Sequence, residues 1–116
     1  TKSIEIVYGL RNFIGNANKF SKSKIFINIK SDNNITEIII EDDGEGYPND
    51  VLRKIGEPYI KSYKSSIKSK SGLGLGIFIG KTLLEKNYAN ILCRNSKTRN
   101  GAEVSIKWKN KDFLNI

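Results

Sequence analysis

The chain has 116 residues, which is the size of one domain with a single hydrophobic core. It contains no histidine and one cysteine, which excludes a histidine-activated nucleophile, a histidine-ligated metal and a disulfide framework within these residues. The formal net charge of +8 predicts an anionic partner, and no apolar run reaches the ~20 residues that span a membrane.

The positive charge is concentrated in one segment, which has no acidic residue between Glu57 and Glu85. Its lysines are Lys61, Lys64, Lys68, Lys70 and Lys81. A local polyphosphate therefore competes with DNA or RNA as the anion that this charge attracts. The remaining alternative is that these lysines only keep the surface soluble.

Residues 3–21 are predicted to form an amphipathic helix, because apolar residues recur at spacings of three and four from Ile6 onward. Asn12, Asn16 and Lys19 fall together on the polar face of this helix. A solvated helix face is the usual explanation for such residues. However, asparagine is a mediocre helix former, carboxamide oxygens can ligate Mg²⁺, and a lysine ammonium can bind a phosphate.

Four strands are predicted. Residues 24–30 alternate apolar and polar side chains, which is typical of a half-buried strand, and residues 35–41 return as its hairpin partner. Three consecutive isoleucines at 38–40 predict that this second strand is buried on both faces. Residues 90–95 and 103–109 are the last two strands. A helix followed by a hairpin predicts an α/β (α+β) two-layer sandwich, with a mixed, largely antiparallel sheet covered by helices on one face.

The second strand leads directly into Asp42, Asp43, Gly44, Glu45 and Gly46. A carboxylate at the end of a buried strand is costly unless something hydrogen-bonds to it. The glycines permit a sharp turn and let a ligand approach the backbone closely. Taken alone, this motif is explained equally well by an ordinary turn between two strands.

After Pro48 the pattern predicts a short helix over residues 51–55. Residues 61–71 are rich in lysine and serine and are predicted to form a loop, and a loop of this length inside one domain favours a functional role. The glycine-rich run at 72–76 then opens a predicted helix over 77–86. Glycines at a helix start can admit an anion to the exposed N–H groups, or they can serve as a hinge for the loop.

Two common phosphate-binding motifs fail on spacing. The run 80–82 resembles the end of a P-loop, but Leu75 stands where its first glycine is required. Counted from Gly74, the third glycine of the dinucleotide fingerprint would fall on Ile79. The sequence therefore argues against both P-loop and Rossmann architectures.

Four motifs occur in one order: Asn12, Asn16, Ala17 and Lys19; Asp42 to Gly46; Glu57, Pro58 and Tyr59; and Gly72 to Gly76. This series resembles the ATP-binding catalytic domain of bacterial sensor histidine kinases, in the superfamily that includes DNA gyrase and MutL, over nearly the whole chain. The runs 56–59 and 72–79, continued through 81–85, are most similar to the RegB/PrrB redox-responsive sensor kinases. The resemblance implies a Bergerat-type ATPase fold with a mobile ATP lid.

The resemblance also implies roles for individual residues of the first two motifs. Asn16 matches the asparagine that ligates the Mg²⁺ bridging the phosphates. Asn12 stands one turn earlier at a companion polar position, and Lys19 matches a basic residue that reaches the phosphates. Asp42 matches the carboxylate that accepts the adenine amino group, and Gly44 and Gly46 match the glycines that shape the floor of its pocket.

The lid and the glycine box are implied to complete the ATP site. Tyr59 stands where the family usually has a phenylalanine, and Lys61 where it often has an arginine. The three glycines of 72–76 match the box that hinges the lid and covers the phosphates. The nucleotide-binding residues expected in this half of the chain are Ile55, Tyr59, Lys61, Lys70, Gly72, Leu73, Gly74, Leu75 and Gly76.

Three departures from the family pattern matter. Lys70 replaces the first glycine of the commoner box, which leaves the geometry of the lid open. Ala102 follows Gly101 where many relatives have a threonine, which leaves a hydroxyl contact near adenine in doubt. The absent histidine places the phosphoacceptor outside this segment. No family motif supports a redox role for Cys93, which we expect to fill space in the core.

The resemblance thus implies that residues 1–116, a piece of a longer kinase, hold Mg-ATP for γ-phosphoryl transfer to a histidine on a separate dimerisation segment. It implies a response regulator as a further partner, a homodimeric full-length protein and a cytoplasmic location beneath an upstream membrane anchor. One alternative is a nucleotide-sensing domain without phosphoryl transfer. A basic nucleic-acid binder is the other, but the charge is its only support, so no nucleic acid is expected.

Overall fold

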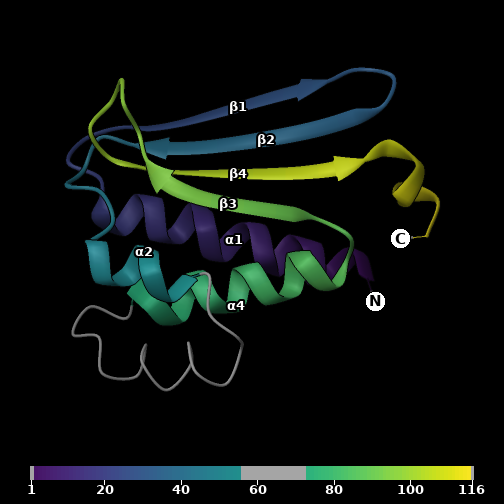
Figure 1. The fold of residues 1–116 in the computed structure, drawn as a ribbon, viewed down its shortest axis with the longest axis horizontal. Helices are drawn as coiled ribbons and strands as arrows, with labels where there is room; N and C mark the ends of the chain where they lie inside the picture. Colours follow the sequence, from purple (N-terminus) through teal and green to yellow (C-terminus); the bar gives the residue numbers. More distant parts are fainter. Residues whose placement is uncertain (1, 56–72, 116) are drawn as a thin grey trace.

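The structure is a computed structural model that describes residues 2–55 and 73–115 (Figure 1). Its elements are α1 (Lys2–Phe20), β1 (Ile25–Ser31), β2 (Ile35–Asp42), α2 (Asn49–Ile55), α4 (Leu73–Lys86), β3 (Asn90–Asn95), β4 (Ala102–Lys109) and the 3-10 helix η1 (Asn110–Asn115). The predicted elements agree with these bounds to within two residues, except that α4 begins at Leu73 rather than at Ile77. The end of the glycine run therefore forms the first turn of α4 instead of preceding it.

The four strands form one sheet in the order β1-β2-β4-β3. Every neighbouring pair is antiparallel, so the mixed sheet that the sequence predicted is wholly antiparallel across the four described strands. β2 and β4 lie at the centre, where Ile40 pairs with Val104 and Ile38 pairs with Ile106. This pairing sets the end of β2, with Asp42, beside the start of β4.

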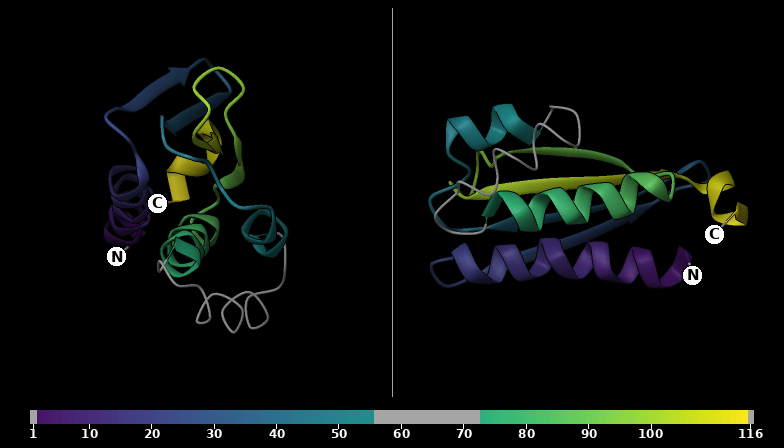
Figure 2. Two further views of the ribbon diagram at one scale, coloured as in Figure 1. Left: turned by 90° about the vertical axis from the view of Figure 1, so that its left-hand side faces the viewer. Right: turned by 90° about the horizontal axis from the view of Figure 1, so that it is seen from below.

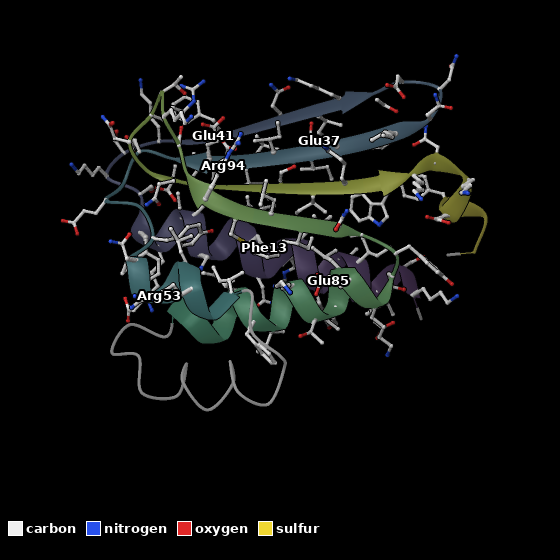
Figure 3. The ribbon with its side chains drawn as sticks, viewed as in Figure 1. Phe13, Glu37, Glu41, Arg53, Glu85 and Arg94 are labelled. Atoms are coloured by element: carbon white, nitrogen blue, oxygen red, sulfur yellow. The ribbon has the colours of Figure 1, made fainter. Side chains whose placement is uncertain are left out.

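Helices α1 and α4 lie side by side beneath one face of the sheet, and α2 lies next to α4 (Figures 1 and 2). The two layers enclose a core whose most deeply buried side chains are Phe13, Ile40, Ile77, Leu84 and Ile106. Phe13 projects from α1 into this core (Figure 3). The predicted two-layer α/β sandwich is thus confirmed.

The opposite face of the sheet carries polar side chains joined across the strands. Glu37 accepts a hydrogen bond from Ser105 Oγ at 2.5 Å, and Arg94 forms an ion pair with Glu103. Figure 3 shows Glu37 and Arg94 along the sheet, away from the helices. The isoleucine run at 38–40 is therefore not buried on both faces: Ile40 faces the helices at 2% exposure, whereas Ile39 is half-buried on the polar face.

β1 is less buried than its alternating pattern predicted. By register, Ile27 and Ile29 lie opposite Ile40 and Ile38 and so on the helix-facing side. They are nevertheless 51% and 66% exposed. The reason is that β1 is the edge strand, and α1 contacts the sheet mainly through β2. The helix layer therefore leaves the outer part of the edge strand in contact with solvent.

Replacing two glycines of α1 by alanine is expected to change the stability of the fold in opposite directions. A Cβ on Gly9 would lie 2.7 Å from Leu84 Cγ, so Gly9→Ala should force α1 and α4 apart and destabilise the fold by about 1–3 kcal/mol. A Cβ on Gly15 would meet nothing within 4 Å, so Gly15→Ala should stabilise the helix by about 0.5–1 kcal/mol. Urea unfolding of both variants measures the two changes, and equal effects would contradict the close packing of α1 on α4.

Candidate functional site

A cavity of ≈ 40 Å³ opens between α1, the ends of β2 and β4, and the loop that follows β2. Its walls include Asn16 of α1, Asp42 of β2, Gly46 and Tyr47 of the loop, and Ala102 of β4. Residues from motifs far apart in the sequence therefore share one site. Three of the predicted site residues, Asn16, Asp42 and Gly46, are brought together here.

Asp42 is held at the end of β2 by backbone donors. Its side chain is buried, at 3% exposure, and Oδ1 accepts hydrogen bonds from Gly44 N at 2.8 Å and Ala102 N at 3.2 Å. These bonds offset the cost of burying the carboxylate. No donor to Oδ2 is recorded among the residues that the structure describes. One oxygen is thus fixed by the protein, while the other has no described donor, and Asp42 lines the cavity.

Two glycines pack directly against this acid and its loop. A Cβ on Gly101 would lie 2.0 Å from the Asp42 carbonyl oxygen and 2.3 Å from Oδ1, so no larger residue fits beside the carboxylate. A Cβ on Gly44 would lie 2.1 Å from the Phe20 carbonyl oxygen at the end of α1. Gly44 therefore packs against the end of α1 and does not line the cavity. Ala102 contributes its backbone N–H, a contact that needs no hydroxyl side chain.

Asn16 has a buried donor without a partner. The residue is half-buried, and its Nδ2 makes no hydrogen bond within the described part of the chain. Its Oδ1 lies 3.2 Å from the position that a Cβ on Gly76 would occupy, so Asn16 faces the first turns of α4. An unpaired buried amide group costs roughly 1–3 kcal/mol. A ligand that pairs with this group in the cavity would recover that cost.

The other two predicted residues of α1 are placed differently. Asn12 Nδ2 donates to the Tyr8 carbonyl oxygen of its own helix at 2.8 Å, and Asn12 does not line the cavity. Lys19 is exposed, with its ammonium 5.4 Å from the ring centroid of Phe20, a residue of the cavity wall. Lys19 is therefore next to a residue of the cavity wall, whereas Asn12 lies one helical turn before Asn16.

The remaining predicted residues belong to the second half of the site. Tyr59, Lys61, Lys70 and Gly72 lie outside the described residues, and their roles stay predictions. The backbone of residues 73–76 forms the beginning of α4. Ile55 ends α2 and packs against the core without lining the cavity.

Asp43 has a structural role that the sequence analysis missed. Its Oδ1 accepts backbone hydrogen bonds from Lys22, Ser23 and Lys24 at 2.9, 3.1 and 3.2 Å, and its Oδ2 accepts from Ser23 Oγ at 2.8 Å. The hydrogen bonds from Ser23, followed by those from its neighbours, hold the pKa of Asp43 well below its usual range. Asp43 thus ties the turn between α1 and β1 to the loop that carries Asp42.

This depressed pKa predicts a pH-dependent contribution to stability. The contribution is complete above the ordinary aspartate pKa of about 3.9 and is lost as pH falls toward the lower pKa of the folded state. Asp43→Asn should therefore lower stability at neutral pH and flatten its decline between about pH 4 and pH 2. Chemical unfolding across this range tests the expectation, with the exposed Glu45→Gln as the control. An unchanged profile for Asp43→Asn would contradict it.

Tyr47 was also missed. It is buried at 7% exposure and lines the cavity next to Gly46. Burial, together with the contact between its hydroxyl and Cys93, raises the pKa of Tyr47 well above its ordinary value. Burial also raises the pKa of the Cys93 thiol to about 12. Cys93 therefore stays protonated at neutral pH and packs against the core, as the sequence predicted for it.

None of the described helices is long and apolar enough to cross a membrane. Comparison with known proteins gives a family match over residues 1–112, to the family described as histidine kinase-, DNA gyrase B-, and HSP90-like ATPase. Sensor histidine kinase RegB of Cereibacter sphaeroides is 36% identical over 120 residues, which cover 90% of this chain and 26% of RegB. Sensor protein RstB of Escherichia coli is 28% identical over 99 residues, covering 85% of this chain and 23% of RstB.

The chain thus spans about a quarter of the length of these curated relatives. Among solved structures, the mycobacterial sensor histidine kinase MprB superposes with a TM-score of 0.59 at 20% sequence identity. This match covers 88% of the chain and 68% of the MprB chain, and it shows that the two share a fold.

Proposed function

The chain belongs to the family of histidine kinase-, DNA gyrase B- and HSP90-like ATPases, and from this membership we propose that it is the ATP-binding catalytic domain of a sensor histidine kinase. In this proposal it holds Mg-ATP and presents the γ-phosphoryl group to a histidine on a separate dimerisation segment. The sequence contains no histidine, so the phosphoacceptor is supplied from outside these residues.

The observation that carries the proposal is that Asn16 and Asp42, each with a side-chain polar atom that has no described partner, line the same cavity. Asp42 Oδ2 offers an acceptor for the adenine amino group, while Oδ1 is occupied by backbone N–H groups. Asn16 offers a carboxamide, whose oxygen suits Mg²⁺ and whose unpaired N–H suits a phosphate oxygen. The arrangement thus fits a purine at one end and a metal-bound phosphate at the other.

Bound Mg²⁺ would supply charge neutralisation on the phosphates, which is the main requirement of phosphoryl transfer. The residues of this chain bind and orient the substrate. Asp42 fixes the base, Asn16 holds the metal-phosphate end, and Lys19 adds a positive charge next to the cavity wall. Asn12 is proposed to support Asn16 from the preceding turn. Such catalysis depends on positioning and electrostatics, with little covalent chemistry for the domain itself.

The lid and the partners complete the proposal. Tyr59, Lys61, Lys70 and the glycine box are proposed to close over the phosphates. The proposed partners are the histidine-bearing dimerisation segment of the same polypeptide, with a homodimeric full-length protein, and a response regulator. We place the domain on the cytoplasmic side of a bacterial membrane, where a lone cysteine such as Cys93 stays reduced.

Titration of ATP into the 116-residue chain, with and without Mg²⁺, tests the proposal. We expect ATP to bind, and Mg²⁺ to strengthen binding. Adding a histidine-bearing dimerisation segment in trans should then give phosphohistidine on that segment. Binding without transfer would favour the nucleotide-sensing alternative, and an absence of ATP binding would overturn the proposal.

A further inference from the structure

We infer that Asn95, at the end of β3, is a positioning residue that holds the cavity wall formed by Gly46 and Tyr47 in its nucleotide-binding shape. Asn95 does not line the cavity and is exposed on the surface. None of the sequence motifs includes it. The inference rests on the proposed function in one respect, that the cavity takes the adenine end of ATP.

The geometry is a two-point clamp on one backbone unit. Asn95 Oδ1 accepts a hydrogen bond from Tyr47 N at 2.6 Å, and Asn95 Nδ2 donates to the Tyr47 carbonyl oxygen at 3.1 Å. Both polar groups of the Tyr47 backbone are therefore paired with one side-chain amide. The carboxamide, on the last residue of β3, pairs with the Tyr47 backbone as a neighbouring strand would.

Gly46 has the backbone conformation, and the lack of a side chain, that the two Asn95 hydrogen bonds require. Its φ of +84° lies in the left-handed region that favours glycine. A Cβ at this position would lie 2.6 Å from Asn95 Oδ1 and 3.0 Å from Asn95 Cγ. The second glycine of the Asp42–Gly46 motif is therefore required both by the turn and by the approach of Asn95. This gives a reason for that glycine that does not depend on direct contact with a ligand.

Strand β3 contacts Tyr47 at two residues. Asn95 binds the Tyr47 backbone, and Cys93, two residues earlier, interacts with the Tyr47 side chain. Tyr47 in turn lines the cavity. If the clamp is removed, the loop gains conformations in which this wall is displaced. The apparent affinity for a ligand then falls in proportion to the fraction of molecules that keep the binding-competent wall.

The decisive variant is Asn95→Ala, compared with Asn90→Ala at the exposed other end of β3. We expect Asn95→Ala to weaken ATP binding about tenfold and to leave the affinity for Mg-tripolyphosphate, which lacks a base, within about twofold. Asn95→Asp should behave like Asn95→Ala, because it keeps the size of the side chain but loses the donor to the Tyr47 carbonyl. Asn90→Ala should bind both ligands as the native chain does.

Amide hydrogen exchange, followed by NMR without nucleotide, tests the clamp independently of ATP. The Tyr47 amide should exchange at least about tenfold faster in Asn95→Ala, while amides in the centre of β4 keep their rates. If the native chain fails to bind ATP, the proposed function fails, and the exchange rate still decides the clamp. The inference is overturned if the Tyr47 amide exchanges at the native rate, if ATP affinity is unchanged, or if ATP and tripolyphosphate lose affinity equally together with global stability.

Discussion

Asp42→Asn is expected to weaken ATP binding by at least about 100-fold while leaving the domain folded. Asparagine keeps a carbonyl oxygen that can accept from Gly44 N and Ala102 N, as Asp42 Oδ1 does. It replaces Oδ2 with an NH₂ group, so a donor would face the amino group of adenine. A site that pairs with one hydrogen-bonding group of its ligand loses much of its affinity when two donors face each other there, because buried polar groups are left unsatisfied.

Isothermal titration of ATP and inosine triphosphate measures this effect. The native chain should prefer ATP, because inosine triphosphate presents a carbonyl oxygen in place of the amino group. Asp42→Asn should lose this preference or reverse it. Glu45→Gln is the matched control, since Glu45 is an exposed acid of the same loop and is outside the cavity wall. A change in ATP affinity of less than about threefold for Asp42→Asn would refute its assignment as the adenine acceptor.

Asn16→Ala is expected to lower Mg-ATP affinity by at least about 30-fold without destabilising the ligand-free protein. The substitution removes a metal ligand and a phosphate donor from the proposed site. It also removes a buried Nδ2 that has no described partner, so the free protein loses an unfavourable group. This combination separates a binding residue from a structural one, because truncating a structural residue at this position would lower the melting temperature.

Asn18→Ala provides the control, because Asn18 is exposed on the same helix and gains the same helix propensity from alanine. Titrations with and without Mg²⁺ should show that Asn16→Ala loses most of the strengthening that Mg²⁺ provides. Thermal unfolding of the ligand-free variants should place Asn16→Ala at or above the native chain. A lower melting temperature with normal Mg-ATP binding would show that Asn16 is a packing residue.

The sequence motifs predicted some of the residues that meet at the cavity, but not all of them. Asn16, Asp42 and Gly46 were predicted from their motifs and line one cavity. Asp43, Tyr47 and Asn95 were missed because their partners lie far along the chain: Asp43 pairs with residues 19–21 positions away, and Asn95 with a residue 48 positions away. No local pattern encodes such contacts. The family resemblance, in contrast, is confirmed by the match over residues 1–112.

The sequence by itself determined where the described helices and strands lie, because hydrophobic periodicity and turn residues act over a few neighbouring positions. Only the tertiary structure decided the strand order, the exposure of Ile27 and Ile29 on β1, and the pairing of Asp42 with a backbone N–H 60 residues away. These features depend on which distant segments come into contact when the chain folds. The spacing of residues in the sequence does not specify those tertiary contacts, whereas close packing and the pairing of buried polar groups do.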